Sequence, residues 1–378
     1  MERKNHGKSP ETSGWGSAGK TPERFFCMTA EPAGSFEEEL HSLLERYRGL
    51  GGDGGDEFLL RFHVSDPSRQ TELIRRAVKE RNSHVSVVGQ PPANGSRIAL
   101  EAWHLGGMLE KRKEQVDGGT VLTARRDHYR LFLAARHAAS YPDSRGQMRE
   151  EFLWLERVAA GQGGSVPEMV HRTWIYCRDI DNNYQGLVDG RNEMFDRYGL
   201  TPESHFIAST GIEGCTETAG RLLHMDSLGI VGLRPEQVRY MEAPDHLSPT
   251  HLYRVAFERG TRIVYGDRSH YFISGTASID AEGKIVHEGD VGRQTERTLE
   301  NMNALLGSCG GTLSDLKQAV VYLRDWADRE AVGRRLMDSP LAEVPHLLLK
   351  APVCRPGWLV EIDGIAVNGA GDTSFAPL

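Results

Sequence analysis

The sequence repeats one pattern three times, at residues 36–79, 146–195 and 294–336. Each copy has an amphipathic helix, a Gly-rich break, an apolar strand that ends in Asp, and a second helix. In the third copy, Leu299 and Met302 recur at helical spacing and help to give the first helix one apolar face. A repeat constrains the fold because each unit must bury its apolar face against a partner surface. The chain is therefore predicted to fold as three copies of one small unit.

The strand of each copy is rich in β-branched and aromatic residues, as strands usually are. These strands are expected at residues 58–64, 171–177 and 319–323. Asp66, Asp179 and Asp325 follow them, where an acidic side chain would cap the second helix. Two further apolar runs close each copy, and a sheet backed by two helices is the economical arrangement for such a unit. Three such units are expected to surround a pseudo-threefold axis, with binding sites where unlike units meet.

Clusters of Gly, Pro and polar residues near Gly118 and Leu233 mark the expected breaks between units. The amino-terminal segment contains no apolar core and is expected to form a disordered leader. The first copy lacks most of the opening strands that the other two copies share. The expected organisation is a leader at residues 1–20, units at 21–117, 118–233 and 234–367, and a tail at 368–378.

Composition narrows the class of partner. The formal net charge of -8 and the isoelectric point near 6.0 argue against a nucleic-acid-binding protein, which would carry a concentrated basic face. Five scattered cysteines predict no disulfide framework and a reducing compartment. No stretch approaches the ~20 apolar residues of a membrane span. We expect a cytoplasmic protein, a monomer or weak homo-oligomer, whose partner is a small anionic metabolite.

Four motifs of the third copy occur in the order typical of the RidA/YjgF family. They are HYFISGTASI, GDVGRQTERTLENMNALL, VVYLRD and VEIDGIAV, within residues 262–367. The third copy therefore resembles that family, whose members are homotrimers of a small α+β unit with sites between subunits. The resemblance implies an α+β fold of three tandem RidA/YjgF-like (chorismate mutase-like) units that form a pseudo-trimer within one chain.

The resemblance is closer to the chorismatases, including the branch that makes 3-hydroxybenzoate. Their GTASI motif is found at residues 275–279, and a motif like CRxxLLVEI is found as CRPGWLVEI at residues 354–362. The chain departs from both families. It has His346 after Pro345, where RidA deaminases place a carboxylate-binding Arg, and residues 280–282 read DAE where chorismatases have VGH.

Glu361 is the first candidate for chemistry. Because side chains alternate along a strand, Val360 and Ile362 share one face while Glu361 takes the other, which would face a neighbouring unit. The resemblance implies that this glutamate transfers a proton. A carboxyl group in an apolar cleft has a raised pKa and can act as a general acid. The alternative is a solvated strand carboxylate. The first copy has Ala99 near the equivalent place.

Cys354 precedes Glu361 by seven residues, so a hairpin could bring the two side chains together. The chorismatase resemblance implies that Cys354 steers the product. The alternative is a small buried hydrophobic residue. Arg355 is expected to point away from Cys354.

A carboxylate substrate requires fixed cations, and Arg offers a planar fork for bidentate binding. The chorismatase resemblance implies a binding role for Arg191. The other candidates for binding substrate are a third-unit Arg, the glycine-containing loop, the wall of the second unit, and a histidine in place of the missing Arg. They are Arg259, Arg262, Arg268, Gly275, Thr276, Ala277, Ser209, Glu213, His346 and His205. Glu213 is either a second acid or a turn carboxylate.

The spacing of His and Cys matches no zinc motif, and we expect neither a metal nor a cofactor. The resemblance implies an enzyme that acts on chorismate or a similar small cyclic carboxylate, in which Glu361 protonates the enolpyruvyl group and pyruvate is released. Two alternatives remain: a RidA-like imine or enamine deaminase, and a non-catalytic protein that binds a small metabolite.

Overall fold

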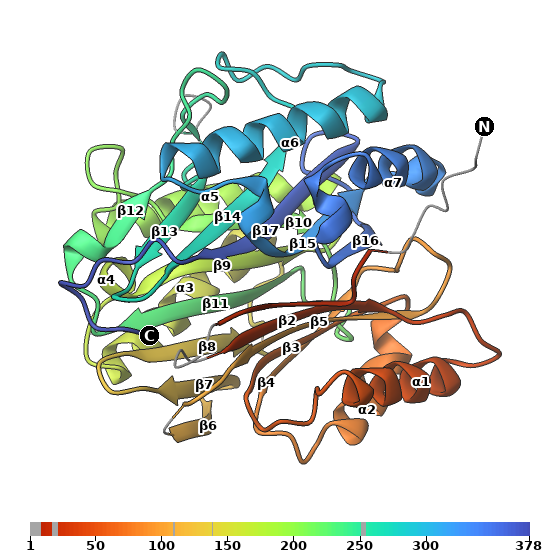
Figure 1. Ribbon diagram of the computed structural model, residues 1–378, viewed down its shortest axis with the longest axis horizontal. Coiled ribbons are helices and arrows are strands. Elements are labelled where there is room, and N and C mark those ends of the chain that lie inside the picture. Colours follow the sequence, from red (N-terminus) through yellow and green to blue (C-terminus); the bar gives the residue numbers. More distant parts are fainter. Residues whose placement is uncertain (1–8, 17–21, 109, 138, 251–254) are drawn as a thin grey trace.

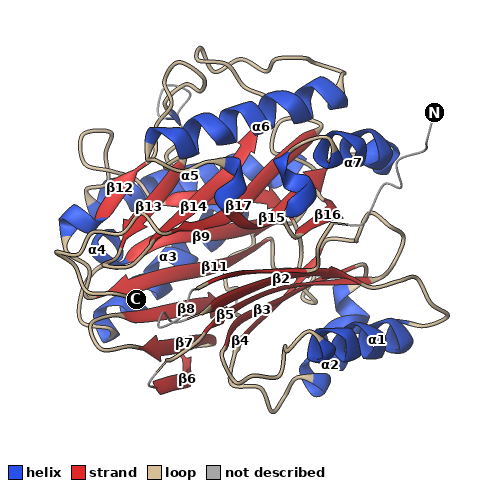
Figure 2. Ribbon diagram, in the orientation of Figure 1, coloured by secondary structure: helices blue, strands red, loops and turns tan. Residues whose placement is uncertain are grey.

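The computed structural model describes residues 9–16, 22–108, 110–137, 139–250 and 255–378. The described chain forms three mixed sheets with helices packed against them. Figures 1 and 2 show the sheets in the middle of the molecule, with α1 and α2 on the outer side of the first sheet and α6 and α7 on the outer side of the third.

The first sheet has the strand order β1-β2-β5-β3-β4. Its elements are β1 (Thr12–Trp15), β2 (Glu23–Thr29), α1 (Phe36–Gly49), β3 (Glu57–Val64), α2 (Pro67–Ala77), β4 (His84–Gly89) and β5 (Ile98–Leu105). Helix α1 begins where the Ser35 hydroxyl accepts a hydrogen bond from the Glu38 amide at 3.2 Å. Strand β1 pairs with β2, so residues 12–15 are not part of a disordered leader; residues 1–8 and 17–20 lie outside the described part of the chain.

The second sheet has the order β10-β9-β11-β8-β7-β6. Its elements are β6 (Glu110–Val116), β7 (Gly119–Arg125), β8 (Arg130–Arg136), α3 (Ser144–Gly161), α4 (Val166–Met169), β9 (Val170–Cys177), α5 (Ile180–Tyr198), β10 (Ala208–Glu213) and β11 (Leu223–Val231). The expected break near Gly118 lies in the turn between β6 and β7, which pair with each other. This pairing favours a unit boundary before β6, and the unit boundaries remain a proposal.

The third sheet has the order β12-β13-β14-β17-β15-β16. Its strands are β12 (Val238–Tyr240), β13 (Gly260–Val264), β14 (Ser269–Ala277), β15 (Leu316–Leu323), β16 (His346–Lys350) and β17 (Val360–Asn368), and its helices are α6 (Val291–Ser308) and α7 (Arg329–Met337). Short 3-10 helices lie at η1 (Pro235–Gln237), η3 (Leu313–Asp315), η4 (Trp326–Asp328) and η5 (Pro340–Glu343). Met302, Leu305 and Leu306 of α6 are fully buried, and each such side chain contributes about 1.5–3 kcal/mol.

The three sheets share one four-strand core. The orders β2-β5-β3-β4, β8-β11-β9-β10 and β14-β17-β15-β16 are equivalent, and in each the last two strands are parallel. This equivalence confirms the α+β fold of three tandem units.

Isolated backbone bridges join each unit to the next. Gly89 at the end of β4 pairs with Cys215 of the second unit, and Ile212 of β10 pairs with Val353 of the third. Leu349 of β16 pairs with Pro92 of the first unit. Because each parallel edge strand meets the next unit and the last meets the first, the three units close into a ring within one chain.

Charged side chains meet where the three sheets converge. Glu101, Asp226 and Asp363 occupy equivalent places in β5, β11 and β17, and each is at most 2% exposed. Arg61 donates to Glu101 and to Asp226, both at 2.9 Å, while Arg172 donates to Asp363 at 2.9 Å. The centre of the molecule is therefore an ionic network with members from all three units.

The carboxy-terminal tail packs onto the third unit. The Gly266 amide donates to the Ala376 carbonyl at 2.7 Å, and the Leu378 amide donates to Asp267 Oδ1 at 3.1 Å.

Within the described residues, no helix combines the length and the apolar character needed to cross a membrane.

Candidate active site

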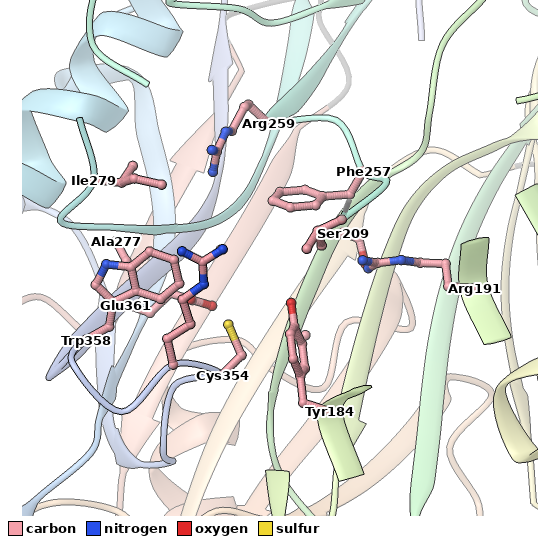
Figure 3. Close-up of a pocket in the computed structure, with 14 residues that line it drawn as sticks. Tyr184, Arg191, Ser209, Phe257, Arg259, Ala277, Ile279, Cys354, Trp358 and Glu361 are labelled. Carbon is pink, nitrogen blue, oxygen red and sulfur yellow. The ribbon is translucent and has the colours of Figure 1, made fainter. Parts of the chain in front are cut away.

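A pocket opens between the second and third units, and most of the predicted residues lie in it (Figure 3). About 520 Å³ of it, part of which is open to solvent, is not filled by protein atoms. Its wall is formed by Tyr184, Arg191, Ser209, Gly211, Val255, Phe257, Arg259, Gly275, Ala277, Ile279, Cys354, Arg355, Trp358 and Glu361.

Glu361 enters the pocket from β17. The strand alternates as expected, because Val360 and Ile362 are fully buried in the core on the opposite face. Glu361 lies between Tyr322 of β15 and Ala277 of β14 in the strand register. A Cβ atom on Gly275 would lie 2.2 Å from Glu361 Oε1, so the carboxyl group fits only beside a residue without a side chain.

The surroundings of Glu361 favour its protonated form. Burial raises its pKa to about 8, and the negative charge of Asp363 adds to this, while Arg259 and Arg172 act in the opposite direction. At pH 7 the side chain is therefore mainly a neutral acid that can donate a proton into the pocket.

Asp363, the other acid near Glu361, is occupied by structural contacts. Its Oδ2 atom accepts hydrogen bonds from Arg172 Nη2 at 2.9 Å and from Thr210 Oγ1 at 2.7 Å. The Thr210 hydroxyl in turn accepts the Gly275 amide at 3.0 Å. This chain of contacts ties β10 of the second unit to β14 and β17 of the third, and so fixes the pocket between them.

Cys354 lies on the loop between β16 and β17. The loop is anchored to the second unit because the Glu213 amide donates to the Pro352 carbonyl at 3.1 Å and Arg324 bonds both the Val353 carbonyl and Asp181. Burial, followed by the nearby Glu361, raises the pKa of the Cys354 thiol to about 12. The sulfur is therefore a neutral thiol, in contact with the Tyr184 hydroxyl, and not a nucleophilic thiolate.

Three arginines supply positive charge to different walls. Figure 3 shows Arg191 and Arg259 on either side of Phe257, and their Cζ atoms lie 5.7 Å and 5.3 Å from its ring centre. The Arg355 Cζ atom lies 4.9 Å from the Trp358 ring centre. Cations on separate walls suit a substrate with more than one carboxylate.

Comparisons with known proteins identify the family. Residues 262–368 match the family model described as endoribonuclease L-PSP. The 3-aminoacrylate deaminase RutC of Acinetobacter baylyi is 31% identical over 96 residues, which are 25% of this chain and 76% of that protein. The chain belongs to the RidA/YjgF family.

Two further RidA/YjgF-like relatives, both from Streptomyces hygroscopicus, match more of the chain. A 3-hydroxybenzoate synthase is 31% identical over 222 residues, 52% of this chain and 63% of that protein. A chorismatase is 28% identical over 285 residues, 70% of this chain and 78% of that protein. A chorismatase crystal structure superposes with a TM-score of 0.68 over 90% of this chain and 98% of that chain; at 22% identity, this likeness shows the fold.

Arg268 and Thr276 lie outside the pocket of this RidA/YjgF chain. Arg268 is 1% exposed and bonds Glu23 at 2.5 Å and Asp267 at 2.7 Å. Its contact with Glu23 joins the third unit to the first. Thr276 points to the opposite face of β14 from Gly275 and Ala277, and its hydroxyl donates to the Ser274 carbonyl at 2.9 Å. Thr276 was predicted to bind substrate, but strand alternation turns its side chain away from the pocket.

Glu213, His346, His205 and Arg262 also lie away from the pocket. The Glu213 carboxylate accepts the Asp179 and Ile180 amides at 2.9 Å and 2.6 Å, so it caps α5 and is not a second acid there. The His346 ring bonds the Val344 carbonyl at 2.9 Å. His205 stacks on Tyr240, and Arg262 bonds the Cys309 carbonyl.

Sequence reasoning missed Tyr184, Phe257, Trp358 and Arg355. Tyr184 precedes Arg191 by two helical turns, so helical spacing could have placed both on one face of α5. Arg355 was expected to point away from Cys354, but the two residues lie on a loop, where strand alternation does not apply.

Polar side chains of α6 hold the third-unit side of the pocket. Gln294 accepts the Leu359 amide and donates to the Gly357 carbonyl, both at 2.9 Å. Asn301 donates to the carbonyls of Ala277 and Ile279 at 3.1 Å and 3.0 Å.

Among the described residues, no group of three or more His, Cys, Asp or Glu side chains is placed to hold a metal ion.

Proposed function

We propose that this protein is a cofactor-independent enzyme that acts on chorismate or a similar small cyclic carboxylate and releases pyruvate. The observation that carries the proposal is a protonated carboxyl group, Glu361, in a pocket whose other walls hold Arg191, Arg259 and Arg355. The similarity to chorismatase and 3-hydroxybenzoate synthase supports the substrate class.

In the proposed mechanism, the arginines hold the two carboxylates and orient the enolpyruvyl group toward Glu361. The proton moves from Glu361 to the methylene carbon, whose vinyl π electrons form the new C–H bond. Positive charge develops on the adjacent ether carbon and is stabilised by the Glu361 carboxylate that remains.

This cation can react in two ways. In hydrolysis, water adds to the ether carbon and returns a proton to Glu361; the bond from that carbon to the ring oxygen then breaks, giving pyruvate and a ring diol. In rearrangement, the bond between the ring and the ether oxygen breaks, that oxygen becomes the ketone oxygen of pyruvate, and the ring loses a proton that returns to Glu361, so the ring becomes a hydroxybenzoate without net uptake of water. In this proposal Cys354, a neutral thiol beside Glu361, steers between these outcomes.

The test is to incubate the full chain with chorismate and to measure pyruvate and the ring product. Glu361→Gln keeps the shape of the side chain but removes the proton, so we expect pyruvate release to fall by about 10²–10⁴-fold while chorismate still binds. Glu282→Gln, at an exposed acid near the GTASI motif, is the matched control and should retain activity. No pyruvate from the wild-type chain would refute the proposal.

Two further measurements address the alternatives. Ammonia release from freshly generated 2-aminoacrylate would indicate a deaminase, and thermal stabilisation by chorismate without turnover would indicate a binding protein. The pocket does not favour the deaminase, because His346 and His205, the candidates to replace its missing Arg, lie elsewhere.

A further inference from the structure

The ring of three units repeats the Glu361 pocket at the interface of the first and second units. His224 of β11 pairs with Tyr176 of β9, as Glu361 of β17 pairs with Tyr322 of β15. The bridge from Gly89 to Cys215 corresponds to the bridge from Ile212 to Val353. A second pocket lies at this equivalent place, lined by residues that include Arg75, Ser86, Lys113, Thr216, Arg221 and His224.

The chemistry of this second pocket differs from that of the first. Arg221 Nη2 lies 2.9 Å from His224 Nδ1, which must accept because Arg only donates. The His224 proton is then on Nε2, which lies 3.2 Å from Ser86 Oγ and 3.3 Å from Asp226 Oδ1. Burial and the charge of Arg221 lower the pKa of His224, so the ring is neutral. His224 therefore occupies the position equivalent to Glu361, but it has no carboxyl proton to donate.

The lining of the second pocket has an excess of positive charge. Among the described residues, Arg75, Lys113 and Arg221 line it with a single carboxylate, Glu217, which pairs with Arg75 at 2.6 Å. Lys113 has no carboxylate partner among the described residues. The carboxylate near Arg221, Glu151, is buried in α3 and does not line the pocket.

An unsatisfied polar atom points to a ligand at the same place. Thr216 lines the pocket and is 3% exposed, yet its hydroxyl has no hydrogen-bond partner among the described residues. A buried hydroxyl without a partner costs about 1–3 kcal/mol, whereas a bound oxygen atom would satisfy it.

From this geometry we propose that the pocket at the interface of the first and second units is a separate binding site for a small oxyanion, a carboxylate or a phosphate, held by Lys113, Arg75 and the Thr216 hydroxyl. Among the described residues its lining holds no protonated carboxyl group, so the site lacks the acid that Glu361 supplies to the other pocket. The inference is independent of the activity proposed for the Glu361 pocket.

The test is calorimetric titration of the full chain with malonate and, separately, with inorganic phosphate, which distinguishes the two sources of the oxyanion. Lys113→Gln removes an exposed charge, and Thr216→Val removes only the unsatisfied hydroxyl, so both variants should fold. We expect each to weaken one binding step about tenfold for malonate or phosphate. Arg355→Gln, in the other pocket, should leave that step unchanged.

The proposal is overturned if neither anion binds to the wild-type chain, or if the only binding step is insensitive to Lys113→Gln and Thr216→Val. It is also overturned if Arg355→Gln alone abolishes binding, because the anions would then occupy the Glu361 pocket.

Discussion

Glu361 is the residue whose protonation controls the proposed reaction. Its pKa of about 8 means that the acid form persists through neutral pH and is lost as the pH rises through that value. We therefore expect kcat/KM for chorismate to fall tenfold per pH unit above about pH 8. The measurement is a pH–rate profile of the wild-type chain, with chorismate affinity of Glu361→Gln measured over the same range as a control. A flat profile to pH 10 would exclude Glu361 as the acid.

Gly275 provides a second test at the scale of single residues. Alanine there would place Cβ 2.2 Å from Glu361 Oε1 and push the carboxyl group aside. Because a displacement of about 1 Å at a reacting group costs about 10²-fold, we expect kcat of Gly275→Ala to fall by that order. Gly211→Ala is the matched control in the same pocket, since its nearest neighbour atom, on Tyr184, lies 3.7 Å away. Equal losses in the two variants would contradict this account.

Strand alternation was sufficient to predict the direction of Glu361, and chain proximity was sufficient to predict Cys354 beside it. The same local rules could not place Arg268 or Glu213. Arg268 pairs with Glu23, which is distant in sequence and belongs to another unit, and Glu213 reaches back to the start of α5. Such partners are set by tertiary contacts between segments distant in sequence, within one unit or between two, which no local pattern records.

At the scale of elements, helix α5 determines where Tyr184 and Arg191 stand. Its first amides are capped by Glu213, and Asp179 before it adopts a left-handed φ of 50°. We expect Glu213→Ala to lower the free energy of unfolding by about 1–2 kcal/mol and to raise KM for chorismate, because the end of α5 that carries Tyr184 loses its anchor. Urea denaturation and steady-state kinetics measure both effects.

The control for that variant is Glu156→Ala, which removes an exposed carboxylate paired with Arg197 near the other end of α5. Surface pairs of this kind contribute less than about 1 kcal/mol, so its stability and KM should stay close to wild type. If Glu213→Ala behaved in the same way, the capping contacts would not position the pocket.

The repeat in the sequence was sufficient to predict the helices and central strands of every unit. It did not predict β1, because the segment TSGW has no apolar alternation and is a strand through its pairing with β2. The interface of the first and third units has no acid equivalent to Glu361 among the described residues. Ala99, which pairs with His63, occupies that position. Divergence of the copies thus left different chemistry at each junction.

At the scale of the whole molecule, the three units depend on one buried ionic network. Arg61 lies between Glu101 of the first unit and Asp226 of the second, and its Cζ atom is 4.6 Å from the Trp174 ring centre. Arg61 and His63 hold the pKa of Glu101 to about 2 against the effect of burial. A lowered carboxyl pKa stabilises the fold above the unfolded value near 4.5, and this contribution is lost as the pH falls from there toward about 2.

Removal of Arg61 should therefore destabilise more than one unit at once. Arg61→Met keeps much of the side-chain volume but leaves Glu101 and Asp226 buried without their shared cation, which costs about 3–5 kcal/mol. We expect a lower unfolding midpoint at pH 7 with a smaller deficit at pH 4, because protonation of the stranded carboxyls relieves the unpaired charge. Arg76→Met, at an exposed pair with Glu72, is the control and should match wild type. A deficit that was the same at both pH values would mean that Arg61 stabilises by packing on Trp174 rather than by joining the charges of two units.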